Sequence, residues 1–240
     1  MELVLAALAV AASSLVGGAT GFATSLLSTP GLLLLGYDVP FVVTVNLAAT
    51  LVSRILVVCR SWRAIEPKRV GLLVAGSAPG AVLGAVTVGA IPVHVLRIFA
   101  GVVVALLGFL LLLPTLGDPA GPGRAGHVAT GLASGYLATS VSLNGPPVAA
   151  LLSAANLPVR AFIANLACYF ICTNLISLTT LGVTGGIPRH GLLPVLPVLL
   201  VAAIVGNQFG TAVSSRVPRK VFKYVVAGLV VVSGVVTALS

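Results

Sequence analysis

Two short segments of the chain combine hydroxyl and amide side chains with a proline that favours the start of a helix. Thr29 stands before Pro30, and Gly145 stands before Pro146. Threonine and glycine are acceptable N-cap residues, and proline is favoured at the first position of a helix. A helix that begins inside a membrane presents unpaired backbone N–H groups and the positive end of its dipole. The two starts are therefore predicted to face one cavity near the middle of the membrane, which would bind an anion.

Neutral polar side chains and glycines complete the predicted substrate site around these two helix starts. The residues assigned to it are Ser25, Ser28, Thr29, Gly31, Ser140, Ser142, Asn144 and Gly145. The alternative is that glycine and proline only permit tight packing and kinks, which membrane helices tolerate. The recurrence of this unusual segment at matching places in both halves of the chain favours a functional role.

Four further polar residues lie within apolar stretches and are included in the predicted substrate site: Asn46, Arg54, Asn165 and Asn174. An amide inside a bilayer is costly unless it has a partner. Asn46 and Asn165 therefore either line the anion site or bond across helices. Arg54 either extends its head to the interface or is the one cation within the membrane that neutralises an anionic substrate.

Several kinds of chemistry lack the residues that they need. The only carboxylates are Glu2, Asp38, Glu66 and Asp118, which fall at termini, interfaces or loops, and the three histidines fall near the ends of apolar spans. Cation transporters and proton relays typically place such residues within the membrane. There is also no acid–base pair, zinc-ligand cluster or acidic motif for Mg²⁺. We expect no enzyme, no metal and no cofactor.

The composition is that of a polytopic membrane protein. Hydrophobic residues make up 58% of the chain and charged residues 7%, whereas soluble domains carry roughly 25% charge. The basic residues behind the net charge of +9 sit at helix ends, so they indicate topology and not nucleic-acid binding. Apolar stretches long enough to cross a bilayer as helices are predicted near 39–60, 70–90, 93–114, 159–184, 191–212 and 219–239.

The chain also repeats itself. The glycine and serine positions of the first segment recur 114 residues later, and the offset grows to 126 toward the C-terminus. The matched sets are Gly17, Gly21, Ser28 and Gly31 with Gly131, Gly135, Ser142 and Gly145, then Asn46 with Asn165, then Gly80 and Gly84 with Gly206 and Gly210. This duplication predicts a first repeat over 1–116, a linker over 117–126 and a second repeat over 127–240, as in many transporter folds.

The stretches 3–36 and 127–157 are too long for one crossing and are interrupted by glycine and proline. We interpret each as a hairpin of short helices, so that three spans remain in each half and the second half is inverted. This arrangement places most basic residues on one side, with both termini outside, as the positive-inside tendency requires. The predicted fold class is an all-α integral membrane protein of two inverted repeats, each a broken-helix hairpin plus three transmembrane helices.

Over essentially all its residues, the chain resembles the TauE/SafE sulfite exporter family, also called the TSUP permeases. The resemblance rests on the glycine-rich first segment with Pro30-Gly31, on the second copy with Asn144-Gly145-Pro146-Pro147, on Asn-Leu-Ala in both following helices and on a basic loop. The second copy departs from the pattern at Ala138-Thr139-Ser140. The resemblance implies a multi-pass transporter of the cytoplasmic membrane, associated with sulfur-containing anions such as sulfite and sulfonates.

The leading hypothesis is a secondary transporter of small sulfur-containing anions, in which the two halves move about a central site by alternating access. Its expected partners are the small anion and the lipid bilayer, with no nucleic acid, and its mass of 24.0 kDa is compatible with a homodimer. A carrier or channel for another small solute, such as a carboxylate or an amino acid, is the alternative. A membrane enzyme would have to use the serines, threonines and asparagines of the two segments without a base.

Overall fold

The computed structural model describes residues 2–87, 123–155, 157–188 and 191–214, with isolated positions between 92 and 106 and between 221 and 235. All regular elements within the described ranges are helices. They are α1 (Glu2–Thr20), α2 (Thr24–Leu34), α3 (Val39–Ser61), the 3-10 turn η1 (Trp62–Ala64), α4 (Pro67–Thr87), α6 (Arg124–Val141), α7 (Gly145–Ala154), α8 (Val159–Thr184) and α9 (Leu192–Ser214).

Five helices are long and apolar enough to cross a membrane, namely α1, α3 together with η1, α4, α8 and α9. The 26 residues of α8 span about 39 Å at 1.5 Å per residue, more than the hydrocarbon core of a bilayer. The all-α membrane fold is therefore confirmed, as are the spans predicted near 39–60, 70–90, 159–184 and 191–212. The spans predicted at 93–114 and 219–239 lie outside the continuously described residues.

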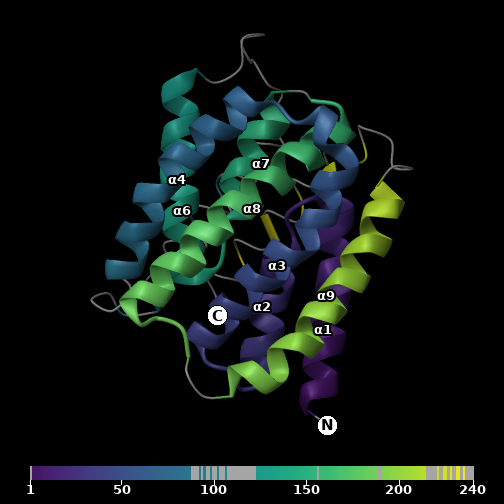
Figure 1. Cartoon of the computed structure of the whole chain (residues 1–240), viewed down its shortest axis with the longest axis vertical. Coiled ribbons are helices and arrows are strands. Elements are labelled where there is room, and N and C mark those ends of the chain that lie inside the picture. Colours follow the sequence, from purple (N-terminus) through teal and green to yellow (C-terminus); the bar gives the residue numbers. More distant parts are fainter. Residues whose placement is uncertain are drawn as a thin grey trace.

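Each half of the chain has the same order of helix lengths, a long helix, a short one and two long ones (Figure 1). The chain breaks between the first two helices at Gly21 and at Ser142, whose φ angles are 93° and 61°. Among the α-helices of the described ranges, α2 and α7 are the short ones, with 11 and 10 residues. The prediction that each hairpin consists of short helices is therefore wrong for its first arm, because α1 has 19 residues and α6 has 18.

The helix breaks also correct the alignment of the two halves. Thr20 and Val141 end α1 and α6, and Thr24 and Gly145 begin α2 and α7. Each pair is 121 residues apart, so the offset of 114 was about two helical turns too small. Because α6 begins at Arg124, it starts within the predicted linker 117–126; the division into repeats stays a prediction.

The helices form two groups that do not coincide with the two halves of the sequence. One buried apolar cluster joins α1, α2, α3 and α9, and a second is formed mainly by α4, α6, α7 and α8. Each half thus contributes its last long described helix, α4 or α9, to the group that holds the first three helices of the other half. In Figure 1, α4 lies beside α6 on one flank and α9 beside α1 on the other.

Glycines allow these exchanged helices to approach backbone to backbone. A Cβ at Gly80 would overlap the carbonyl of Leu132, and one at Gly206 would overlap the carbonyl of Ala11. One turn further along, Gly84 meets Tyr136 and Gly210 meets Leu15 in the same way. The residue numbers rise together, so α4 runs parallel to α6 and α9 runs parallel to α1. Small residues are the usual means by which helices pack closely in membranes.

Candidate functional site

The two helix breaks lie against each other in the interior. A Cβ at Gly145, the first residue of α7, would stand 2.9 Å from Cβ of Phe22 and 3.1 Å from its carbonyl oxygen. Phe22 is part of the break between α1 and α2, and its side chain is 2% exposed. The starts of α2 and α7 are therefore neighbours, and backbone N–H groups that lack helical partners are concentrated there.

A first polar network joins α2 to α3. The Ser28 hydroxyl donates to Oδ1 of Asn46 at 2.6 Å, and Nδ2 of Asn46 donates to the Thr29 hydroxyl at 3.0 Å. Thr29 in turn donates to the backbone oxygen of Ser25 at 2.6 Å. The Asn46 amide is thus satisfied across helices, which is the arrangement that a buried amide requires.

A second network joins α7 to α8 and reaches α3. Nδ2 of Asn144 donates to Oδ1 of Asn174 at 2.7 Å, and Nδ2 of Asn174 donates to the backbone oxygen of Leu47 at 3.2 Å. The Tyr169 hydroxyl donates to the Ser134 hydroxyl at 2.7 Å, which donates to the Asn144 carbonyl. Because Leu47 follows Asn46, the two networks meet on adjacent residues of α3.

Arg54 lies on the same helix and has no exposed surface. One terminal nitrogen donates to the backbone oxygen of Gly17 at 2.9 Å, and the guanidinium carbon lies 6.0 Å from the centre of the Phe170 ring. Its Nε and its second terminal nitrogen have no hydrogen-bond partner in the described part of the chain. Arg54 therefore does not extend to the interface, and the alternative of an intramembrane cation is the one that agrees with the structure.

Two further polar atoms without a partner among the described residues belong to side chains that contact Gly17, the acceptor of Arg54, and Ser53, its neighbour in the chain. The Thr24 hydroxyl lies where a Cβ of Gly17 would be, and it has no partner. Nδ2 of Asn207, on α9, donates to the backbone oxygen of Ser53 at 3.1 Å, while its Oδ1 is unpartnered. Thr24 and Asn207 were missed as site residues. Asn207 is polar within an apolar helix, but its aligned first-half position is Ala81, and the absence of symmetry hid it.

The remaining residues of the two segments have local roles. α2 begins at Thr24 and contains Pro30 in its interior, so the prediction of a helix start at Thr29-Pro30 is wrong. Gly31 lies within α2 and faces Ala9, whose Cβ would be 3.6 Å from an added Cβ. The Ser140 hydroxyl donates to the backbone oxygen of Tyr136 within α6.

The second predicted helix start is correct to within one residue. α7 begins at Gly145, with Asn144 as its N-cap residue and proline in its first turn. Ser142 is the left-handed residue that ends α6. The Asn144 side chain does not cap the helix, because its amide bonds to Asn174 instead.

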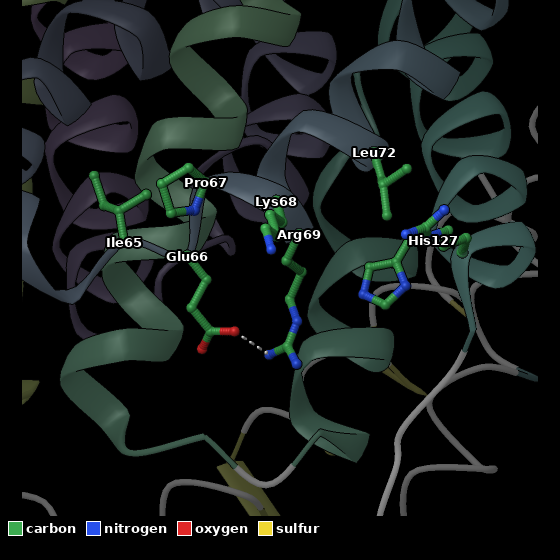
Figure 2. A pocket seen from close by; sticks show the side chains of 8 residues that line it. Ile65, Glu66, Pro67, Lys68, Arg69, Leu72 and His127 are labelled. Atoms are coloured by element: carbon green, nitrogen blue, oxygen red, sulfur yellow. Dashed lines mark ion pairs between the residues drawn. The ribbon is translucent and has the colours of Figure 1, made fainter.

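Basic residues gather at the end of the bundle where α4 and α6 begin. Lys68, Arg69, Arg124 and His127 line an open pocket of about 660 Å³ there (Figure 2). Nη1 of Arg69 forms an ion pair with Glu66 at 3.2 Å. This pocket is lined by none of the residues that surround Arg54.

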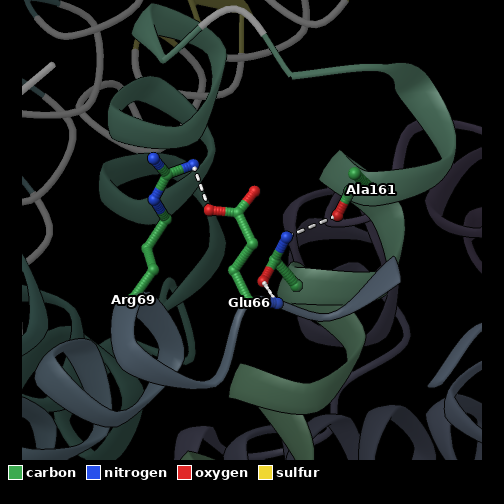
Figure 3. A network of polar contacts seen from close by, with 4 residues as sticks. Glu66, Arg69 and Ala161 are labelled. Carbon is green, nitrogen blue, oxygen red and sulfur yellow. Dashed lines mark hydrogen bonds and ion pairs between the residues drawn. The ribbon is translucent and has the colours of Figure 1, made fainter. Parts of the chain in front are cut away.

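Asn165, which the duplication matches with Asn46, lies toward this end of the bundle. Its Oδ1 accepts from the backbone nitrogen of Glu66 at 2.8 Å, and its Nδ2 donates to the backbone oxygen of Ala161 at 2.8 Å (Figure 3). It therefore fixes the loop before α4 onto α8. Since Val39 and Val159 begin α3 and α8, the position equivalent to Asn46 is Leu166 by helix start.

The described residues hold no cluster of three histidine, cysteine, aspartate or glutamate side chains. Of the carboxylates, Asp38 caps α3 by accepting from Phe41 N at 3.1 Å, and Glu66 pairs with Arg69. Within the described ranges, Arg54 is thus a buried cation without an anionic partner.

Comparison with known protein families identifies the fold family. Residues 5–237 match the model of the sulfite exporter TauE/SafE family. The chain belongs to this family. The TauE/SafE family is a family of membrane transport proteins, which confirms the resemblance noted from the sequence and agrees with a multi-pass transporter that is not an enzyme. Comparisons with curated proteins and with solved structures gave no significant match.

Proposed function

We propose that this TauE/SafE protein is a secondary transporter that moves a small sulfur-containing anion, such as sulfite or a sulfonate, across the cytoplasmic membrane. The observation that carries the proposal is the Arg54 guanidinium, which is fully buried with two nitrogens unpartnered. A buried charge without a partner is destabilising by several kcal/mol. A substrate oxyanion would supply the missing partner.

The chemistry of the surroundings suits an anion of this kind. A guanidinium presents two adjacent N–H donors that match two oxygens of an oxyanion. The Thr24 hydroxyl can donate a third hydrogen bond, and the backbone N–H groups at the starts of α2 and α7 add positive potential nearby. We assign Arg54 as the counter-charge and Thr24 and Asn207 as positioning groups for the substrate.

The guanidinium alone does not select sulfur over carbon, because a carboxylate offers the same pair of oxygens. The preference for a sulfur anion rests on membership of a family described as sulfite exporters. A tetrahedral or pyramidal anion also carries a third oxygen, for which the Thr24 hydroxyl provides a donor. A carrier of carboxylates is therefore the candidate that the binding experiment must separate.

For the transport cycle we propose alternating access between two sides of the membrane. Arg54 is on α3, in one helix group, and Asn174 is on α8, in the other. Asn174 bonds to Leu47 of α3, so the polar networks cross the boundary between the groups. A substrate that engages both groups would couple its binding to their relative movement.

The test is binding of matched anions to purified full-length protein, measured by calorimetry and by thermal shift. The panel is sulfite, sulfate, thiosulfate, methanesulfonate and ethanesulfonate, with acetate and propionate as carboxylate counterparts. We expect saturable binding of at least one sulfur anion, which Arg54→Met abolishes. Arg60→Met is the matched control, because Arg60 lies on the same helix but is exposed and bonded to Gln208 at 2.8 Å.

Two outcomes would change the assignment. Competition by acetate and propionate at the same concentrations as the sulfonates would favour a carboxylate carrier. Equal loss of binding in Arg54→Met and Arg60→Met would show that general charge and not the buried site governs affinity. Uptake of the bound anion into proteoliposomes, driven by an imposed ion gradient, then separates a transporter from a binding protein.

A further inference from the structure

The pocket between the starts of α4 and α6 has the features of a second binding site, independent of the proposed transport site. It is lined by Lys68 and Arg69 from α4 and by Arg124 and His127 from α6. Figure 2 shows the Glu66–Arg69 ion pair on one side of the pocket, with Leu72 and His127 on the other. The two parallel helices both direct the positive end of their dipoles to this end.

The pocket carries two cations that are not compensated. Glu66 is paired with Arg69 at 3.2 Å, so this carboxylate is already engaged. Neither Lys68 nor Arg124 has a hydrogen-bond or ion-pair partner within the described part of the chain. Both side chains are exposed to the pocket and its surroundings. Together with the helix N-termini they favour a phosphate group.

His127 supplies the second, independent observation. The side chain is 7% exposed, and its Nδ1 lies 3.1 Å from the backbone oxygen of Gly123. A carbonyl can only accept, so Nδ1 carries the hydrogen of this bond. Nε2 is buried and has no partner. A ligand that carries a negative charge and a hydroxyl, which can donate or accept, would supply the missing partner of Nε2.

A phosphodiester with a free hydroxyl on its headgroup meets both requirements. The remaining lining includes Ile65 and Leu72, whose apolar side chains suit acyl chains better than a soluble ion. Basic pockets between membrane helices are a known means of holding anionic headgroups. The pocket also lies at the start of two helices, where headgroups are found when such helices enter a bilayer.

We propose that this pocket binds an anionic phospholipid with a glycerol-type headgroup, such as phosphatidylglycerol. The phosphodiester contacts Lys68 and Arg124, and a headgroup hydroxyl forms a hydrogen bond with Nε2 of His127. The bound lipid holds the starts of α4 and α6 together at this end of the bundle. The site is separate from Arg54, so its failure would leave the proposed transport function standing.

The experiment measures lipid binding to the full-length protein in detergent by native mass spectrometry and by thermal shift. The ligands are phosphatidylglycerol, phosphatidylmethanol, phosphatidylcholine and the soluble headgroup glycerol 1-phosphate. Phosphatidylmethanol keeps the anionic diester but lacks the hydroxyl. We expect phosphatidylglycerol to bind most tightly, phosphatidylmethanol more weakly and phosphatidylcholine least, with no shift from millimolar glycerol 1-phosphate.

The variants separate the charge from the hydroxyl contact. Lys68→Gln and Arg124→Gln should each weaken phosphatidylglycerol binding about fivefold, the effect of one interfacial cation. His127→Leu should remove the difference between phosphatidylglycerol and phosphatidylmethanol. Arg63→Gln is the matched control, since Arg63 lies in the same connection, 5.3 Å from the Trp62 ring, and does not line the pocket.

Three results would overturn the proposal. Equal binding of phosphatidylglycerol and phosphatidylcholine would show that the pocket does not require an anionic headgroup. Equal weakening by Arg63→Gln and Lys68→Gln would show that unspecific surface charge attracts the lipid. A thermal shift from glycerol 1-phosphate as large as that from the lipid would assign the pocket to soluble phosphate esters. Anion binding at Arg54 is measured on each variant to confirm that it is folded.

Discussion

Replacement of Arg54 by methionine should stabilise the protein while it destroys anion binding. This combination is unusual, because most substitutions of fully buried residues destabilise. It is expected here because the substituted group is a charge whose burial is not compensated by any described carboxylate. Methionine fills a similar elongated volume with a flexible apolar chain.

The magnitude follows from the contacts that Arg54 makes and lacks. Burial of the unpaired guanidinium costs several kcal/mol. Against this stand one charged hydrogen bond to Gly17, worth about 1.5–3 kcal/mol, and the contact with the Phe170 ring, worth about 0.5–2 kcal/mol. The Gly17 oxygen also accepts from Gly21 N at 2.7 Å, so it keeps a partner after the substitution.

By analogy with buried ion pairs replaced by apolar residues, the expected gain is about 1–3 kcal/mol. For a chain of this length it corresponds to an apparent melting temperature roughly 2–10 °C higher. The assay is thermal unfolding of wild type, Arg54→Met and Arg54→Lys in the same detergent, with and without saturating substrate. The substrate should raise the melting temperature of the wild type and leave that of Arg54→Met unchanged.

The reasoning would be refuted if Arg54→Met melted well below the wild type and still bound the anion. Arg54 would then be a structural residue that positions α1 through Gly17. Arg54→Lys keeps the charge but loses the planar pair of donors, so weaker yet detectable binding is expected from it.

Three further predictions concern the framework. Ser142→Gly should raise the free energy of unfolding by about 1 kcal/mol, because Ser142 holds a left-handed conformation; lower thermal stability would contradict this. Gly80→Ala should reduce the yield of monodisperse protein by overlap with a backbone carbonyl, whereas Gly71→Ala, with open space around it, should not. Asn174→Leu should cost about 1–3 kcal/mol in chemical denaturation, since it leaves the buried Asn144 amide without its partner, while the Leu47 carbonyl keeps its bond within α3; a neutral effect would show that water replaces the lost bond.

Composition and span length were sufficient to predict the membrane fold, because the bilayer sets both. The start of α7 was predictable because Asn144-Gly145-Pro146 combines residues with capping preferences and a proline at the start of the helix. The start of α2 was not, because Thr29-Pro30 has the same local pattern but lies inside a helix. The residue that marks the true start of α2 is Gly21, because it ends α1 with a φ of 93° that glycine adopts readily.

The candidate site was only partly predictable because its residues meet through tertiary packing. Asn207 approaches Ser53 only because α9 joins the helices of the first half. Corresponding positions of the two halves share contacts with a backbone carbonyl. The Thr139 hydroxyl donates to the Ala81 carbonyl at 3.0 Å, and Gly18, which lies 121 residues before Thr139, faces the Asn207 carbonyl. The side chains at the aligned positions Ala81 and Asn207 differ, so the duplication gave no reason to assign Asn207 to the site.

The exchange of α4 and α9 bears on which parts of the molecule we expect to move together. The glycine contacts hold α4 against α6 and α9 against α1 at backbone distance, so in the proposed alternating-access cycle we expect the two mixed groups to move as units. The chain passes between these groups in the connections that precede α4 and α9. The connection before α9 has glycines at positive φ, Gly185 at 76° and Gly191 at 77°, and the one before α4 has the single turn η1. In the proposed alternating-access cycle we expect these two crossovers to act as hinges, so that a cross-link that rigidifies either one arrests transport without touching the anion.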